Sequence, residues 1–220
     1  MAGKWKPGFR NATPDRLHRI DHWLTMADDS YQEGKTVARL RAGARSGALS
    51  SCLGIPDARH YTSQWEQWIN ENRWDDVVLS RTEARFLVAG QAEIGASVCG
   101  PSERVLKQVL RSGGINPFLQ CLWWVTKLHA LSIAEEYRGR GYGGHMLENA
   151  VKRAGRSGFI AMYGVFDGRQ RPHLAEFYES HGFTILDFDQ PISLEEITGI
   201  GGAGIGPDEG ERFFVRNLMP

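Results

Sequence analysis

The fold of this 220-residue chain is decided by the stretch LSIAEEYRGRGYGGHMLENAV, residues 131–151. An apolar strand ends at Ile133, a charged and glycine-rich turn runs from Glu135 to Gly144, and apolar residues then recur at helical spacing. Glycine lets the backbone of such a turn approach a ligand closely, and the first N–H groups of the helix have no partner within it. A pyrophosphate is the natural ligand of this arrangement.

Basic residues are concentrated around this turn. Residues 138–171 contain seven Arg and Lys against two acidic residues, a net charge of +5, whereas the whole chain has 26 basic and 26 acidic residues. This segment suits a polyanionic cofactor. The absence of net charge on the chain argues against general nucleic-acid binding.

A second motif is AEFYESHGF, residues 175–183. Together with Leu131-Ser132-Ile133 and the RGRGYG turn of residues 138–143, it resembles the GNAT superfamily of N-acetyltransferases. The resemblance is sharp from Leu131 to Phe183 and covers residues 76–220 in element order. It implies an α/β (α+β) fold whose central mixed, mostly antiparallel sheet is splayed into a V and flanked by helices, with acetyl-CoA in the opening.

The resemblance also implies site residues. Tyr178 takes the place of the general acid beside the thioester sulfur, and Leu131 and Ile133 offer backbone groups to pantetheine. Arg171 stands where the family often has an Asn that contacts the pantetheine arm. The implied cofactor-binding residues are Leu131, Ser132, Ile133, Arg138, Gly139, Arg140, Gly141, Tyr142, Gly143, Gly144, Arg171 and Phe177.

The expected chemistry is direct transfer of an acetyl group from acetyl-CoA to a primary amine. A tyrosine hydroxyl, with an ordinary pKa of about 10, can protonate the departing thiolate at neutral pH. Strand alternation puts His129 on the same side as Leu131 and Ile133, so His129 or water is the candidate base. A packed core histidine is an equally weighted interpretation of His129. Lys127 shares the alternation but is a poor base, and the strand lacks the carboxylate that many family members have.

Residues 1–220 are expected to form one domain, with residues 1–75 mainly helical and shaping the acceptor side, and residues 76–220 forming the sheet and the acetyl-CoA-binding core. A helix from Pro14 to Ala27 opens the chain. The glycine-rich segment 199–210 is expected to be a mobile loop beside the acceptor. Further helices are expected within 36–48, 63–73, 103–111, 146–154 and 172–181, and strands at 77–79, 86–88, 94–98, 122–133, 159–166, 183–188 and 212–218.

Several classes of protein are disfavoured by the sequence. The longest apolar stretch, residues 115–125, is about half the length of a membrane span, and the N-terminus does not resemble a secretory signal, so the cytoplasm is expected. The three cysteines are widely spaced and indicate buried thiols without a metal. His18 and His22 lie at i, i+4 but lack a third ligand. Trp65 and Trp68 are expected in the core.

The sequence leaves more than one function open. Gly139, Gly141 and Gly144 also satisfy G-x-G-x-x-G, and Asp167 lies near the position of a ribose-binding acid, but too few residues follow for an NAD-binding double-wound sheet. A non-catalytic acyl-CoA-binding or regulatory module stays compatible with the motifs, as does a toxin-type acetyltransferase that acts on aminoacyl-tRNA. The sequence does not identify the amine acceptor, and it leaves a homodimer open.

Overall fold

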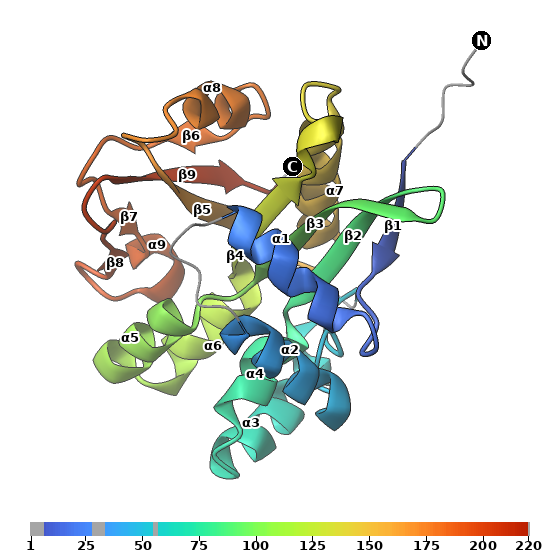
Figure 1. Cartoon of the computed structure of the whole chain (residues 1–220). Coiled ribbons are helices and arrows are strands. Elements are labelled where there is room, and N and C mark those ends of the chain that lie inside the picture. The colour runs from blue at the N-terminus through green and yellow to red at the C-terminus, as the bar shows by residue number, and fades with distance from the viewer. Residues whose placement is uncertain (1–6, 28–33, 55–56, 220) are drawn as a thin grey trace.

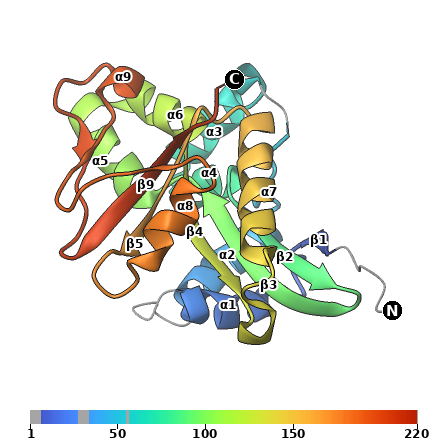
Figure 2. The same ribbon diagram turned by 90° about the horizontal axis from the view of Figure 1, so that it is seen from above.

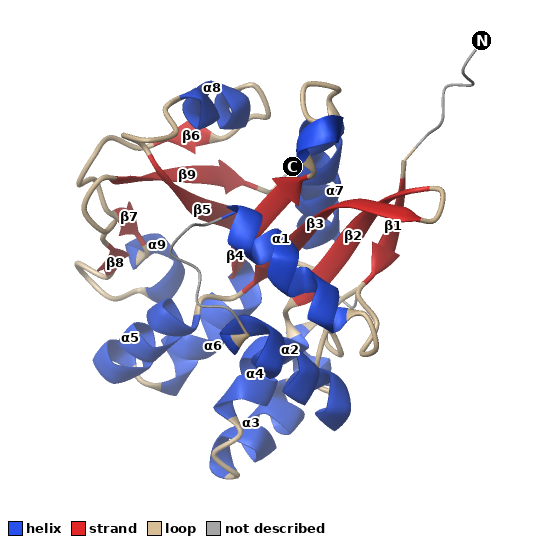
Figure 3. Cartoon of the chain, viewed as in Figure 1, coloured by secondary structure: helices blue, strands red, loops and turns tan. Residues whose placement is uncertain are grey.

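The computed structural model describes residues 7–27, 34–54 and 57–219, and its centre is a seven-stranded mixed sheet (Figure 1, Figure 3). The strand order is β1-β2-β3-β4-β5-β9-β6, and every neighbouring pair is antiparallel except β4 and β5. The strands are β1 Gly8–Asn11, β2 Glu83–Ala89, β3 Ala92–Gly100, β4 Val125–Ile133, β5 Ala161–Asp167, β6 Thr184–Ile185 and β9 Glu211–Asn217. This architecture confirms the expected α/β fold.

Helices cover both faces of the sheet, and Figure 2 shows α1 and α7 on opposite sides of β3 and β4. Residues of α7 and α8 share one apolar cluster with β5 and β9, whereas α1 and α2 pack with β2, β3 and β4 in another. The helices are α1 Ile20–Ala27, α2 Lys35–Ser46, α3 Thr62–Asn70, α4 Trp74–Ser80, α5 Glu103–Gly113, α6 Ile115–Trp124, α7 Tyr142–Arg156, α8 His173–Glu179 and α9 Glu195–Thr198.

The sheet is splayed between its two central strands. β4 and β5 pair in parallel only from Val125/Ala161 to Lys127/Tyr163, yet β4 continues to Ile133 and β5 to Asp167. Beyond Lys127, the β5-facing edge of β4 therefore has no strand partner in the described part of the chain. This is the V that the sequence predicts.

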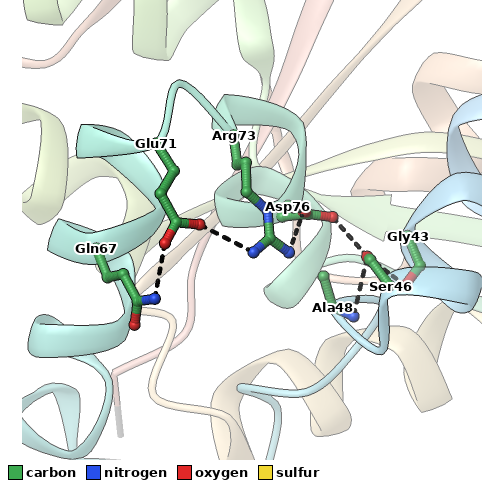
Figure 4. Close-up of polar contacts among 7 residues, drawn as sticks. All are labelled: Gly43, Ser46, Ala48, Gln67, Glu71, Arg73 and Asp76. Carbon is green, nitrogen blue, oxygen red and sulfur yellow. Dashed lines mark hydrogen bonds and ion pairs between the residues drawn. The ribbon is translucent and has the colours of Figure 1, made fainter.

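The run Val77-Val78-Leu79 is helical, so the strand predicted there is wrong. Asp75 and Asp76 occupy the first turn of α4, where carboxylates favour a helix. Asp76 accepts bonds from Arg73 Nε (2.8 Å) and Ser46 Oγ (2.6 Å), which fix the start of α4 against α2 (Figure 4). A short buried apolar run has no periodicity that separates helix from strand.

Two other boundaries differ from the sequence prediction. The long strand expected from Leu122 begins at Val125, because residues 115–124 form α6; Pro117 is tolerated in its first turn, where an amide N–H is not needed. At the N-terminus, Pro14 lies in a turn after β1, and helical structure begins only at Leu17. The predicted helix is therefore too long at its start.

Arg81 connects the helical part of the chain to the sheet core, with its side chain almost fully buried. Its guanidinium donates to the carbonyls of Cys52 (3.0 Å), Ser157 (2.9 Å) and Trp123 (2.8 Å), and its Cζ lies 4.0 Å from the ring centroid of Phe159. Ser157 follows α7 and Trp123 lies in the last turn of α6, so the cation meets the negative ends of two helix dipoles. Burial lowers the pKa of Arg81 to about 10, so it stays charged at neutral pH.

The segment between β6 and β9 is partly regular. β7 Ile192–Ser193 pairs with β8 Gly204–Ile205, so the expected loop of residues 199–210 contains one strand of a small hairpin. Gln108 of α5 donates to Gly204 O at 3.1 Å. The hairpin and α9 therefore pack beside α5 and α6, as Figure 1 shows.

Candidate active site

The first turn of α7 provides a set of backbone donors. Gly141 stands before the helix with a left-handed backbone (φ 79°), and its carbonyl accepts the amide of His145 at 3.0 Å. The amides of Tyr142, Gly143 and Gly144 come before this first helical bond, and no acceptor for them is found in the described residues. Gly139 is also left-handed (φ 71°), which explains why glycine precedes the helix twice.

A hollow of about 600 Å³ lies in front of these amides. A Cβ on Gly139 or Gly141 would meet no atom within 4 Å, so the backbone itself borders open space there. A Cβ on Gly143 would stand 3.7 Å from Phe177. The lining residues are Ile133, Arg138, Gly139, Gly141, Gly143, Gly144, His145, Glu148, Phe177 and His181. Seven of the twelve expected cofactor-binding residues are among them.

Arg138 supplies positive charge at the mouth of this hollow. Its Nε donates to Ile133 O at 3.0 Å, which holds the exposed side chain across the turn. Arg140 is placed differently, because its Cζ lies 5.7 Å from the ring centroid of Tyr137 and it does not line the hollow. Tyr142 likewise packs towards Tyr137. Of the two arginines in the turn, Arg138 is therefore the one suited to an anion in this hollow.

The end of β4 presents backbone groups to the V. Ala134 N–H donates to Ile94 O at 2.9 Å, and Ser132 pairs with Ala96 two residues away. Hydrogen-bonded and non-hydrogen-bonded pairs alternate in antiparallel strands, so Leu131 and Ile133 direct their N–H and C=O groups away from β3. These groups face the edge that β5 leaves open.

Ser132 and Arg171 make other contacts. Ser132 Oγ donates to Trp23 O of α1 at 2.8 Å, on the face opposite α7. Arg171 Nη1 donates to Ala27 O, at the end of α1, at 2.6 Å. Both expected cofactor residues thus hold α1 across the two arms of the V, so their side chains are not among the cofactor contacts proposed below.

Tyr178 lies in an aromatic cluster on the α8 side of the V. Its ring stacks on Phe214 with 3.7 Å between centroids, and Phe166 and Phe183 complete the packing. Burial raises the pKa of Tyr178 well above 10, with a smaller contribution from the nearby Cys99 thiol. The hydroxyl is therefore protonated at neutral pH, as a general acid requires.

His129 occupies a β-bulge. Val98 pairs with Ala130 but Cys99 pairs with Leu128, which leaves His129 as the extra residue of β4. Leu131 and Ile133 pack with Met146 of α7, whereas His129 turns towards Gly100, whose carbonyl lies 3.1 Å from Nε2. The expected shared side of His129, Leu131 and Ile133 is wrong, because the extra residue shifts the alternation.

The environment of His129 keeps the ring neutral. Burial of the group within the protein lowers its pKa to about 4, although residue 129 as a whole is solvent-exposed, and the nearby Lys127 ammonium lowers the pKa further. Because the Gly100 carbonyl can only accept a hydrogen bond, Nε2 carries the hydrogen and Nδ1 keeps the lone pair. Nδ1 can accept a hydrogen bond, but a group with this pKa is a weak base at neutral pH.

The sequence did not identify His181 and Glu148 as site residues. His181 belongs to the second motif and lies directly before Gly182, which ends the predicted helix. Its position in the sequence does not indicate a contact with the turn of α7.

The described residues contain no group of three or more His, Cys, Asp or Glu side chains that could hold a metal. No described helix is long and apolar enough to cross a membrane.

Residues 83–185 match the Acetyltransferase (GNAT) domain family. This match covers β2 to β6, including both arms of the V and the turn before α7, so this part of the chain is similar to a GNAT acetyltransferase domain. No curated protein matches the chain in sequence.

Solved structures share the fold at low sequence identity. A GNAT-family protein from Desulfovibrio desulfuricans is 11% identical with a TM-score of 0.53, over 97% of this chain and 100% of that chain. A Salmonella typhimurium protein solved with its cofactor acetyl-CoA is 13% identical (TM-score 0.51, 98% and 95%). The ribosomal-protein-S18-alanine N-acetyltransferase of Escherichia coli is 10% identical (TM-score 0.50, 98% and 96%). At these identities the likeness concerns the fold alone.

Proposed function

We propose that this protein is an N-acetyltransferase that moves an acetyl group from acetyl-CoA to a primary amine. The observation that carries the proposal is the hollow at the first turn of α7, where unpartnered amides and Arg138 meet at the open end of β4. Helix amides and a cation suit the pyrophosphate of acetyl-CoA. The Salmonella neighbour, solved with acetyl-CoA, supports the same ligand.

In the proposed reaction the amine nitrogen attacks the thioester carbonyl directly. The new C–N bond forms, the C–S bond breaks, and the Tyr178 hydroxyl gives its proton to the departing sulfur. The free N–H groups at the end of β4, near Leu131, polarise the carbonyl oxygen. Because His129 is a weak base, water takes the amine proton, and the lone pair on Nδ1 of His129 orients that water.

The acceptor enters, in this proposal, from the face of the sheet opposite α7. His129 turns to that face, and α1 lies across β4 there, held by Ser132 and Arg171. Residues 1–75 would thus shape the acceptor side, as part of one domain with residues 76–220. We further propose that the protein acts in the cytoplasm.

The test is acetyl-CoA-dependent thiol release in the presence of primary amines, with two matched glycine variants of α7. Gly143→Val places a branched side chain in the hollow, whereas Gly155→Val changes the far end of the same helix, where a Cβ meets only Leu218 O at 3.9 Å. Both variants make the same Gly→Val change in the same helix, so intrinsic helix propensity changes in the same direction in both. We expect turnover in the wild type and in Gly155→Val and its loss in Gly143→Val.

Acetyl-CoA binding without thiol release from any amine would leave a non-catalytic acyl-CoA-binding module and contradict the proposal. Equal activity of the two glycine variants would contradict the position of the cofactor. The melting temperatures of both variants without ligand serve as the control for folding.

A further inference from the structure

Two residues that line the hollow, Phe177 and His181, come from α8 and the turn that follows it. All other lining residues belong to the end of β4, the turn and α7. Among the described residues, His181 is therefore the one ionisable group that reaches the hollow from the β5 arm of the V. Nothing in the sequence motifs assigns it a ligand.

The hydrogen bonds of His181 fix the orientation of its ring. Nδ1 lies 2.7 Å from Phe177 O, and because a carbonyl can only accept, Nδ1 carries a hydrogen. Nε2 is then directed at the first turn of α7, where a Cβ on Gly144 would collide with it. This contact explains why residue 144 is a glycine, since any side chain there would displace the imidazole from the edge of the hollow.

We infer that His181 binds the diphosphate of acetyl-CoA through Nε2, as a second cationic ligand opposite Arg138. The inference rests on the proposed function. In the neutral ring, with hydrogen on Nδ1, the lone pair on Nε2 would repel a phosphate oxygen. In the protonated ring, Nδ1 still donates to Phe177 O and Nε2 donates a charge-assisted hydrogen bond to phosphate.

Other charged groups share these surroundings. Arg138, His145 and Glu148 line the same hollow from the turn and α7, and Arg216 of β9 donates to the backbone carbonyl of His181. His145 and the remaining groups are unchanged in a variant of His181 alone. A difference between wild type and variant therefore isolates the contribution of His181.

The sign of the pH dependence follows from the charge. An anion that binds the protonated ring favours proton uptake, so affinity is highest at low pH and falls as the pH rises. The 3′-phosphate of CoA would obscure this trend, because a phosphate monoester titrates at a pH of about 6. Dephospho-CoA removes that group and keeps the diphosphate, so it is the appropriate probe.

The experiment measures the Kd of dephospho-CoA by calorimetry between about pH 5.5 and 8.5 for the wild type, His181→Gln and His181→Leu. We expect the wild-type affinity to fall about tenfold over this range. His181→Gln keeps an uncharged donor near the position of Nε2, so its affinity should be intermediate with a flatter profile. His181→Leu should bind about tenfold more weakly at low pH.

His18→Gln, at an exposed position near the N-terminus, should keep the wild-type profile. Equal Kd values and equal pH profiles for the wild type and His181→Gln would overturn the inference and leave the proposed function standing. Failure of the wild type to bind dephospho-CoA and acetyl-CoA at any pH would overturn both. The melting temperature of each variant without ligand shows whether the variant is folded. A folded His181→Leu that binds more weakly than His181→Gln has lost a ligand contact.

Discussion

Tyr178, the proposed general acid, shows at the scale of one residue how packing keeps a hydroxyl protonated. Its ring stacks on Phe214 and contacts Phe166, and burial raises the pKa of the hydroxyl. Tyr178→Phe keeps the stacking and removes the proton. We expect kcat for thiol release to fall by about 100-fold or more, with the Kd of acetyl-CoA unchanged. Full kcat in this variant would exclude Tyr178 as the general acid.

His129 provides a pH-dependent test of the site. Its pKa of about 4 in the folded chain lies below the ordinary value of about 6.5, so the unfolded chain takes up the proton first as the pH falls. The neutral ring therefore contributes stability above about pH 6.5 that is lost towards pH 4. His129→Asn keeps a donor for Gly100 O and does not titrate.

We expect the melting temperature of the wild type to fall more than that of His129→Asn between about pH 7 and pH 5. We also expect kcat/KM to show no change near neutral pH that depends on the protonation of His129. The lowered pKa of His129 would be contradicted if the melting temperatures of the wild type and the variant changed equally with pH. It would also be contradicted if kcat/KM of the wild type changed near pH 6.5 and this change were absent from the variant.

At the scale of elements, Arg81 joins the ends of α6 and α7 to the segment around Cys52. Arg81→Met removes the donor of three buried carbonyls, and each unsatisfied group costs about 1–3 kcal/mol. We expect the free energy of unfolding to fall by about 3 kcal/mol or more in urea titrations. Arg41→Met, an exposed substitution on α2, should change it by less than about 0.5 kcal/mol.

The hairpin formed by β7 and β8 carries a prediction for acceptor binding. If the glycine-rich segment 199–210 shapes the acceptor side, replacing it with a shorter turn should change the KM of the amine and leave the Kd of acetyl-CoA unaltered. If binding of the amine and binding of acetyl-CoA weakened equally, the segment would affect the fold as a whole and not the acceptor site. The melting temperature of the variant distinguishes general destabilisation.

Some elements follow from the sequence and others do not. Short apolar runs between polar or glycine breaks predicted β2 and β3, and helical spacing or a glycine stop predicted α5, α7 and α8. The prediction failed at α4, where a short apolar run has no periodicity that separates helix from strand, and at α6, whose last apolar residues continue without a break into β4. The position of His129 failed for another reason: a bulge depends on pairing between β3 and β4, which one strand's sequence does not contain.

The site was predicted unevenly for the same reason. Glycines and Arg138 form a local motif, so their place in the hollow follows from consecutive residues. Ser132 and Arg171 contact α1, and His181 contacts the first turn of α7, through tertiary packing that joins segments far apart in the chain. Local patterns carry no information on these contacts.

At the scale of the whole molecule, we expect the V between β4 and β5 to be one continuous site, with the cofactor entering over α7 and the acceptor from the face of α1. The two arms share only three parallel residue pairs, so a ligand between them should stabilise the whole sheet. An acetyl-CoA concentration about 100-fold above Kd adds about 2.7 kcal/mol to the free energy of unfolding. For a chain of this size that corresponds to a rise of about 5–10 °C in melting temperature.

The most direct test is a thermal-shift titration with acetyl-CoA, CoA and NAD on the wild type, Arg138→Glu and Arg138→Gln. We predict that acetyl-CoA and CoA raise the melting temperature of the wild type, that the acidic variant loses this rise, and that Arg138→Gln retains most of it. NAD should have no comparable effect. No rise with acetyl-CoA, or a rise with NAD alone, would contradict the assignment of the α7 turn to acetyl-CoA.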